Sequence, residues 1–253
     1  MARRRFFVEA VRNGEAALEG EAAEHLRRVL RAEPGEQYEI SDNQSVYLAE
    51  VQGFRKGAVL FRVLERLACD SPPLGLTLLV SLIKFDRFEW IVEKATELGV
   101  EAIVPVLAGR SEQGLDKAAA RRVERWRRIA LESSQQARRA RLPEIRECLS
   151  FREALKTPAG GRWMLDESRE APPLLPALVG DMPDTVCLLV GPEGGWTDEE
   201  RKEATSCGWV RVSLGAQILR AETAAIAGVA ILTAAKQAGP PRPRAVEGLK
   251  TEP

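Results

Sequence analysis

A nearly continuous apolar run at residues 76–83 restricts the fold of this chain more than any other feature. Its sequence, Leu-Thr-Leu-Leu-Val-Ser-Leu-Ile, lacks the polar alternation of a half-exposed strand. Such a run is typical of a strand that is buried on both faces of a parallel sheet. It is far shorter than the roughly 18 to 20 apolar residues that a membrane span requires, and no other run reaches that length. The run therefore predicts a buried strand of an α/β fold.

The sequence after this run alternates between strand and helix patterns. Asp86 with Glu89 marks a helix start, Gly99 marks its stop, and Thr197 with Glu200 fits a capping box. We expect further strands at residues 103–107, 163–165, 186–190 and 209–214. We expect helices at residues 86–98, 116–139, 198–207 and 221–238. Because alternating strands and helices form parallel sheets with helices on both faces, we predict this architecture for residues 74–238.

Residues 1–70 follow a different pattern. Short segments of alternating apolar and polar residues predict a small β domain of half-exposed antiparallel strands, with a short helix at residues 21–30. The turn sequences Pro34-Gly35 and Asp42-Asn43 separate them. The Pro-rich segment at 70–73 marks the domain boundary, and we expect the Pro-rich residues 239–253 to be a disordered tail.

The composition excludes several classes of function. The 253 residues include one histidine, His25, and 37 basic residues balance 37 acidic ones. A Ser-His-Asp hydrolase or a two-histidine zinc site needs imidazoles at defined positions, so both are disfavoured. The four cysteines form no Cys-x-x-Cys pair, which argues against a zinc ribbon and against a disulfide framework. Since the basic N-terminus runs into charged residues instead of an apolar core, we expect a cytoplasmic protein.

Positive charge gathers locally between residues 117 and 141. This basic stripe contains only two acidic residues, Glu124 and Glu132. Its bases are Lys117, Arg121, Arg122, Arg125, Arg127, Arg128, Arg138, Arg139 and Arg141. A stripe of this kind is either a solvated helix face, which is the commoner case, or a surface that binds nucleic-acid phosphates.

Two glycine-containing loops follow predicted strands, at the sheet edge where α/β proteins bind ligands. Residues 191–196 read Gly-Pro-Glu-Gly-Gly-Trp, and residues 214–224 read Leu-Gly-Ala-Gln-Ile-Leu-Arg-Ala-Glu-Thr-Ala. The first loop disfavours phosphate, because Pro192 lacks an N–H donor and Glu193 carries negative charge. It is either a site for a neutral or cationic ligand or a tight strand-to-helix turn. Arg220 in the second loop is either a salt-bridged structural residue or one aimed into the site.

The two loops closely resemble the signature of the ribosomal small-subunit methyltransferase E family. The matching residues are Gly191-Pro192-Glu193-Gly194-Gly195, Leu214-Gly215, Ile218-Leu219-Arg220 and Glu222-Thr223-Ala224. Further matches are Arg5-Phe6-Phe7, His25-Leu26, Val29-Leu30-Arg31, Lys84-x-Asp86, the segment 94–100, and Gln136-x-x-Arg139-x-x-Leu142-Pro143. Two positions depart from the family pattern, Phe85 and Gln135, where a glycine and a glutamate are common.

The resemblance implies a fold and a function. The fold is an N-terminal PUA-like RNA-binding β-barrel, residues 1–70, joined to a SPOUT-type methyltransferase domain, residues 74–238, whose C-terminal segment forms a trefoil knot. The implied function is methylation of N3 of a uridine in 16S ribosomal RNA, with S-adenosylmethionine as cofactor, by a homodimer that needs neither metal nor membrane. Two alternatives stay open: a SPOUT methyltransferase for another rRNA or tRNA nucleotide, and a catalytically silent RNA-binding adaptor.

The resemblance also implies roles for individual residues. Arg220 is expected to stabilise charge on the uracil or to clamp a phosphate, and Glu193 and Glu222 are the candidate bases. The alternatives are a backbone-bound turn carboxylate for Glu193 and a helix-entrance cap for Glu222. Cofactor contacts are expected from Leu165, Leu189, Gly191, Pro192, Glu193, Gly194, Leu214, Gly215, Ile218, Leu219 and Arg220. RNA contacts are expected from Arg5, Arg31, Lys84, Arg110, Gln136 and Arg139.

Overall fold

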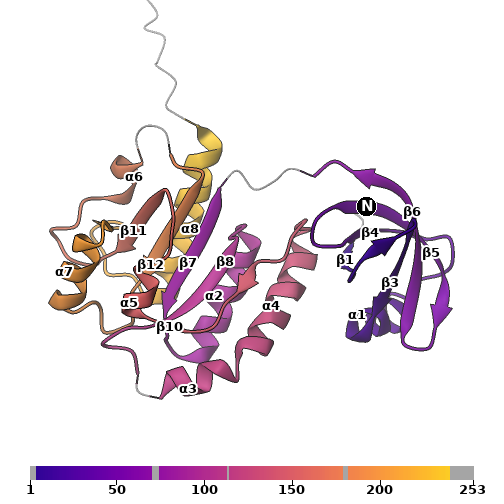
Figure 1. Cartoon of the computed structure of the whole chain (residues 1–253), viewed down its shortest axis with the longest axis horizontal. Helices are drawn as coiled ribbons and strands as arrows, with labels where there is room; N and C mark the ends of the chain where they lie inside the picture. Colours follow the sequence, from indigo (N-terminus) through magenta and orange to yellow (C-terminus); the bar gives the residue numbers. More distant parts are fainter. Residues whose placement is uncertain (1–3, 70–73, 113, 179–181, 240–253) are drawn as a thin grey trace, which may run out of the picture.

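Two separate sheets organise the chain, as Figure 1 shows for the computed structural model. The structure describes residues 4–69, 74–112, 114–178 and 182–239. The predicted boundary at residues 70–73 and the predicted tail, apart from Gly239, lie outside these described residues.

The N-terminal sheet has six strands in the order β1-β4-β5-β6-β3-β2. The strands are β1 (Arg5–Phe7), β2 (Val11–Arg12), β3 (Glu15–Glu19), β4 (Gln37–Ser41), β5 (Val46–Arg55) and β6 (Ala58–Leu67). The pairs are antiparallel except β1 with β4. In the described ladders β1 and β2 are the two edges, so the sheet does not close into the expected barrel. The predicted short helix is α1 (Gly20–Glu24), which continues as a π-helical turn over His25–Val29.

The second sheet is entirely parallel, which confirms the predicted architecture. Its order is β10-β8-β7-β12-β11-β13, with β9 paired to β8. The strands are β7 (Gly75–Ser81), β8 (Ala102–Leu107), β9 (Glu144–Ile145), β10 (Leu149–Ser150), β11 (Gly161–Leu165), β12 (Thr185–Val190) and β13 (Val210–Val212). The apolar run forms β7, which lies between β8 and β12. Its leucines are buried on both faces of the sheet, since Leu78 and Leu79 belong to different core clusters.

Helices cover both faces of this sheet, as predicted. On one face α2 (Phe85–Glu97), α4 (Val123–Gln136) and α8 (Ala221–Ala238) contribute Phe88, Trp126 and Val229 to the core. On the other, α5 (Phe151–Ala154) and α7 (Asp198–Ser206) contribute Phe151 and Ala204. A short α6 (Leu174–Ala177) follows β11. None of the helices within the described residues is long and apolar enough to cross a bilayer.

Two predicted helices differ in the structure. The single helix expected at residues 116–139 is two helices, α3 (Leu115–Ala120) and α4, because the amides of Arg121 and Arg122 bond three residues back, to Ala118 and Ala119. At this break Arg122 lies over the Phe85 ring, 5.0 Å from its centroid, a tertiary contact that helix periodicity does not encode. Helix α2 begins at Phe85, so Asp86 lies in its first turn and is not its cap.

The predicted helix caps are otherwise correct. Thr197 and Glu200 form the predicted capping box of α7, with each side chain accepting a hydrogen bond from the other residue's backbone N–H. Helix α8 has the predicted limits. Short-range chemistry therefore places these helix ends correctly, because a cap uses only neighbouring residues.

The segment after α4 contacts the N-terminal sheet. The Ser41 hydroxyl donates to the Ala140 carbonyl at 2.6 Å, and the Leu142 N–H donates to Asn43 Oδ1 at 2.7 Å. Glu39 on β4 accepts from Arg5 at 2.7 Å and is also paired with Arg138. Because Glu39 is buried, this cluster holds residues 138–142 against β1 and β4.

Candidate functional site

A cavity of about 500 Å³ lies at the carboxyl ends of β11, β12 and β13. Its wall consists of the ends of these strands and the segments after them, namely residues 165–167, 190–195, 213–215 and 217–221, together with Arg87 and Ala224. The two predicted loops thus face one another across a single cavity. Parallel strands collect their following loops at one edge, which is why residues far apart in sequence meet here.

The first loop is fixed to β11 by a buried tryptophan. Trp196 is completely buried, and its Nε1 donates to the Leu165 carbonyl at 2.8 Å. A Cβ at Gly191 would lie 2.9 Å from Trp196 Cε2, a distance that real Cβ atoms essentially never show. Glycine at position 191 therefore lets the loop lie directly on the indole.

The other side of this loop is held by residues that follow β8. The Arg110 guanidinium donates to the Gly194 carbonyl at 2.9 Å. The Gly109 N–H donates to Glu200 Oε1 at 2.7 Å, while Oε2 of the same carboxylate accepts from the Thr197 N–H of the capping box. One buried carboxylate thus joins the β8 loop to the start of α7.

Arg87 connects the two loops electrostatically. It lies in the first turns of α2, lines the cavity and pairs with Glu193. Its Nε is also 3.8 Å from Oε1 of Glu222, which is buried in the first turn of α8. Among the described residues, Glu222 Oε2 has no hydrogen-bond partner. The two carboxylates are therefore held around a single guanidinium, which joins the first loop to the start of α8.

Sequence reasoning did not single out Arg87. Its one local signal is its position, directly after the Lys84-x-Asp86 match and on the same helical turn. Its partner Glu193 is 106 residues away in sequence, and such a pairing depends on the fold. The Glu193 carboxylate pairs with the side chain of Arg87. The alternative considered for Glu193 was a carboxylate bound to the backbone of its own turn.

Arg220 differs from Arg87 in having a side chain without an ion-pair partner among the described residues. It occupies the N-cap position of α8, is exposed and lines the cavity. Within the described part of the chain it makes no ion pair. Because an unpaired guanidinium keeps its donors available, this residue is able to interact with an anionic group placed at the cavity.

Ten of the eleven residues predicted to contact a cofactor line this cavity. They are Leu165, Gly191, Pro192, Glu193, Gly194, Leu214, Gly215, Ile218, Leu219 and Arg220. Leu189 is the exception, because its side chain is fully buried in the core cluster on the other face of the sheet, which also contains Val104 and Met164. Its neighbour Val190 lines the cavity, since successive strand residues face opposite sides. The lining residues that sequence reasoning missed also include Asp166, Glu167, Ser213, Gln217, Ala221 and Ala224.

The residues predicted to bind RNA do not form one cluster. Arg31, Lys84 and Gln136 are exposed, whereas Arg110 is exposed but bonded to the first loop. Arg5 pairs with the buried Glu39. The Arg139 guanidinium donates to the carbonyls of residues 96, 100 and 141. Arg5 and Arg139 therefore hold the fold together, and contact of any of the six residues with RNA stays a prediction.

The basic stripe is partly neutralised by acids from other parts of the chain. Arg122 and Arg125 share Glu89 of α2, and Arg128 lies 3.7 Å from Glu21 of α1. These partners are 33 or more residues away in sequence. Counting charges within the stripe alone therefore overstates its positive potential.

Comparison with known proteins identifies the family. A model of the RNA methyltransferase domain family matches residues 70–233. The chain is 35% identical over 216 residues to the ribosomal RNA small subunit methyltransferase E of Synechocystis sp., covering 83% of this chain and 70% of that protein. It is 33% identical over 236 residues to the Bacillus subtilis protein of the same name, covering 87% and 92%. The chain belongs to the ribosomal RNA small subunit methyltransferase E family.

Solved structures of similar proteins have the same fold. The ribosomal RNA small subunit methyltransferase E of Neisseria gonorrhoeae, bound to S-adenosyl methionine, is 30% identical with a TM-score of 0.82, over 92% of this chain and 98% of that one. A Legionella pneumophila protein in complex with the cofactor SAM is 28% identical with a TM-score of 0.84, over 93% and 98%. The cavity described above therefore lies in a fold whose relatives bind this cofactor.

Proposed function

We propose that this chain is an S-adenosylmethionine-dependent methyltransferase that methylates N3 of a uridine in the 16S RNA of the small ribosomal subunit. The observation that carries the proposal is the single cavity built by both signature loops in a member of this family. The proposal includes the finer features that the resemblance implies: a PUA-like domain at residues 1–70, a SPOUT domain at residues 74–238 with a trefoil knot, a homodimer and a cytoplasmic location.

The residues of the cavity fit this cofactor. Leu165, Leu214 and Ile218 give it apolar walls suited to an adenine ring, and Glu167 and Glu193 add carboxylates suited to a cationic group. Pro192 lacks an N–H donor, so the first loop is a poor phosphate site. The backbone and side chains of the ten predicted lining residues would hold the cofactor.

The chemistry requires an anionic uridine. Bound S-adenosylmethionine supplies an electrophilic methyl group. N3 of uridine carries a proton and becomes a good nucleophile only when that proton leaves, so the protein must stabilise negative charge on the uracil. Arg220 makes no ion pair with any other described residue and lines the cavity, and a positioned donor at developing charge is the largest single source of catalysis in many enzymes. Its fork of N–H groups suits either the uracil oxygens or an adjacent phosphate.

The two candidate bases give a testable pH dependence. Glu193 is paired with Arg87, and Glu222 is buried beside the same arginine. Because Arg87 forms an ion pair with each of these carboxylates, we expect the proton to leave to water. Methylation rates measured against pH should rise with the same slope in wild type, Glu193→Gln and Glu222→Gln. A variant in which the rise disappears, while its melting temperature is unchanged, would identify that carboxylate as the base.

Two measurements test the proposed function against its alternatives. At a concentration 100 times its Kd, S-adenosylmethionine should stabilise the protein by about 2.7 kcal/mol, visible as a raised melting temperature. Cells that lack the protein should lose N3-methyluridine from 16S RNA, as shown by mass mapping of nucleosides. Loss of another methylated nucleoside would indicate a different SPOUT substrate. Unchanged methylation with retained RNA binding would indicate a silent adaptor.

A further inference from the structure

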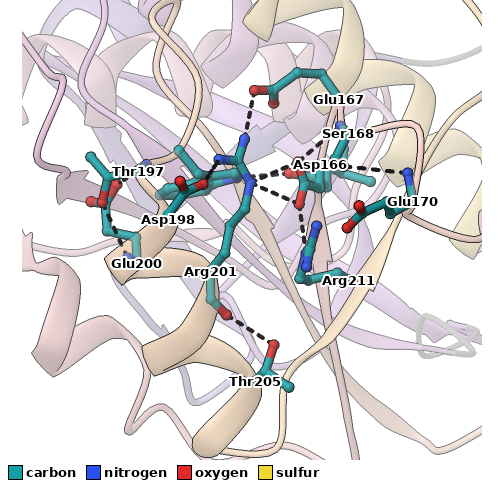
Figure 2. Close-up of polar contacts among 12 residues, drawn as sticks. Asp166, Glu167, Ser168, Glu170, Thr197, Asp198, Glu200, Arg201, Thr205 and Arg211 are labelled. Atoms are coloured by element: carbon teal, nitrogen blue, oxygen red, sulfur yellow. Dashed lines mark hydrogen bonds and ion pairs between the residues drawn. The ribbon is translucent and has the colours of Figure 1, made fainter.

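A buried carboxylate organises the loop that follows β11. The Asp166 side chain is fully buried and accepts from Arg211 Nε at 2.7 Å, Arg201 Nε at 3.2 Å and the Ser168 N–H at 3.0 Å (Figure 2). Burial by itself raises the pKa of Asp166, but these hydrogen bonds outweigh it and hold the pKa below its ordinary value. Asp166 is therefore a fixed anion that orients Arg201.

Arg201 connects Asp166 to two further carboxylates, those of Asp198 and Glu167. Its three nitrogens are divided among three acids: Nε contacts Asp166, Nη1 contacts Asp198 at 3.1 Å, and Nη2 donates to Glu167 Oε1 at 2.9 Å. Figure 2 shows the guanidinium between these side chains. Because the guanidinium is planar and rigid, fixing Nε on Asp166 also fixes where Nη2 meets Glu167.

Glu167 lies between Arg201 and the glycine loop. A Cβ at Gly195 would overlap Glu167 Oε1, and Gly195 has a φ of 69°, so glycine is favoured there on both counts. Glu167 lines the cavity and its side chain is 38% exposed. Among the described residues Oε2 of Glu167 accepts no hydrogen bond, whereas Oε1 is held by Arg201.

We infer that Glu167 is a further cofactor-binding residue, held in place by Arg201 and Asp166, whose carboxylate accepts a hydrogen bond from the α-ammonium or a ribose hydroxyl of S-adenosylmethionine. The inference rests on the proposed function, because it needs this cofactor in the cavity. A carboxylate already clamped by an arginine loses little side-chain entropy when a ligand binds, so more of the interaction appears as affinity. No sequence motif marks Glu167.

Calorimetric titration of Glu167→Gln tests the inference. The change keeps the shape of the side chain and removes its charge. Since hydrogen bonds to charged groups contribute about 1.5–3 kcal/mol, the Kd for S-adenosylmethionine and S-adenosylhomocysteine should rise by roughly 10-fold to 100-fold. Glu170→Gln is the matched control, because Glu170 follows in the same loop but does not line the cavity, and it should bind as wild type does.

Methylthioadenosine distinguishes the two donor groups. This ligand has the ribose and adenine but no amino-acid portion. If Glu167 binds the α-ammonium, Glu167→Gln should leave the Kd for methylthioadenosine unchanged; if it binds a ribose hydroxyl, this Kd should rise with the other two. Either result supports the inference and names the group.

A double-mutant cycle tests the positioning role of Arg201. Arg201→Lys keeps the charge but removes the fork that reaches Asp166 and Glu167 together. Arg201→Lys alone should raise the Kd for S-adenosylmethionine. The double variant Arg201→Lys with Glu167→Gln should have the same Kd as Glu167→Gln alone. A purely structural role would lower the melting temperature of Arg201→Lys and leave the two effects on Kd additive.

Failure of the inference differs from failure of the proposed function. If wild type binds S-adenosylmethionine and Glu167→Gln binds it equally well, the inference is wrong and the proposed function stands. The inference is also wrong, with the proposed function intact, if Glu170→Gln is as damaging as Glu167→Gln. If wild type binds none of the three ligands, both fail.

Discussion

Replacing Arg220 with lysine is expected to lower kcat for methylation by about 100-fold, the loss seen when one positioned donor is removed from developing charge. Arg220 lines the cavity, is exposed and makes no ion pair within the described residues, so its donors are free for the substrate. Lysine keeps the positive charge but lacks the planar fork that contacts two oxygens together. The cofactor Kd should change by less than about 3-fold, because the charge and the backbone of the loop are retained.

Single-turnover rates at saturating RNA measure this effect on the chemical step. Arg152→Lys is the matched control, since Arg152 is an exposed arginine of α5 that pairs with Glu203 and does not line the cavity. A rate for Arg220→Lys that recovers at high RNA concentration would assign Arg220 to clamping a phosphate. A wild-type rate at all RNA concentrations would remove Arg220 from the mechanism.

Replacing Arg139 with methionine is expected to lower the free energy of unfolding by about 3 kcal/mol. Its Nη1 and Nη2 donate to the Thr96 and Val100 carbonyls, each at 2.6 Å, and its Nε donates to the Arg141 carbonyl. Burial lowers the pKa of Arg139 to about 10, so the group stays charged at neutral pH. Thr96 is at the C-terminal end of α2, where a positive charge is favourable. Methionine leaves these carbonyls without their donor.

Urea unfolding measures this loss, with Arg141→Met as the matched control. Arg141 is exposed and belongs to the same basic stripe, so its replacement should leave the unfolding midpoint unchanged. If Arg139 instead served only to contact RNA, the expected results would be reversed. In that case Arg139→Met would keep its stability, and the slope of log binding constant against log salt would fall by about 1.

Local pattern was enough to predict the main elements and the sheet edge at which the two loops lie. The apolar run correctly predicts β7 as a buried parallel strand, and the Thr197–Glu200 pair correctly predicts the start of α7. The two loops were predicted to lie at the ligand-binding edge because the rule for parallel sheets needs only strand order. The structure brings both loops to one cavity.

Local sequence patterns did not predict side-chain contacts between residues that are far apart in the chain. Arg139 reads as a surface arginine at the end of a basic helix, yet its donors reach carbonyls about 40 residues earlier. Val190 lines the cavity, whereas the side chain of the predicted Leu189 is buried on the other face of the sheet, because strand alternation gives two faces and does not say which one meets the cavity. The break before α4 was missed because Arg122 contacts Phe85 and Glu89, both on another helix.

The sequence by itself determined the main strands and helices, the parallel sheet and the family, because caps, periodicity and ordered motifs depend on residues close together in the chain. Only the tertiary structure decided which charged side chains form ion pairs with one another. Arg87 joins Glu193 and Glu222, and Arg201 holds Glu167 against Gly195, through pairs that the folded sheet brings together. The physical reason is that two charged groups form an ion pair only within about 4 Å of each other, and folding brings these residues that close.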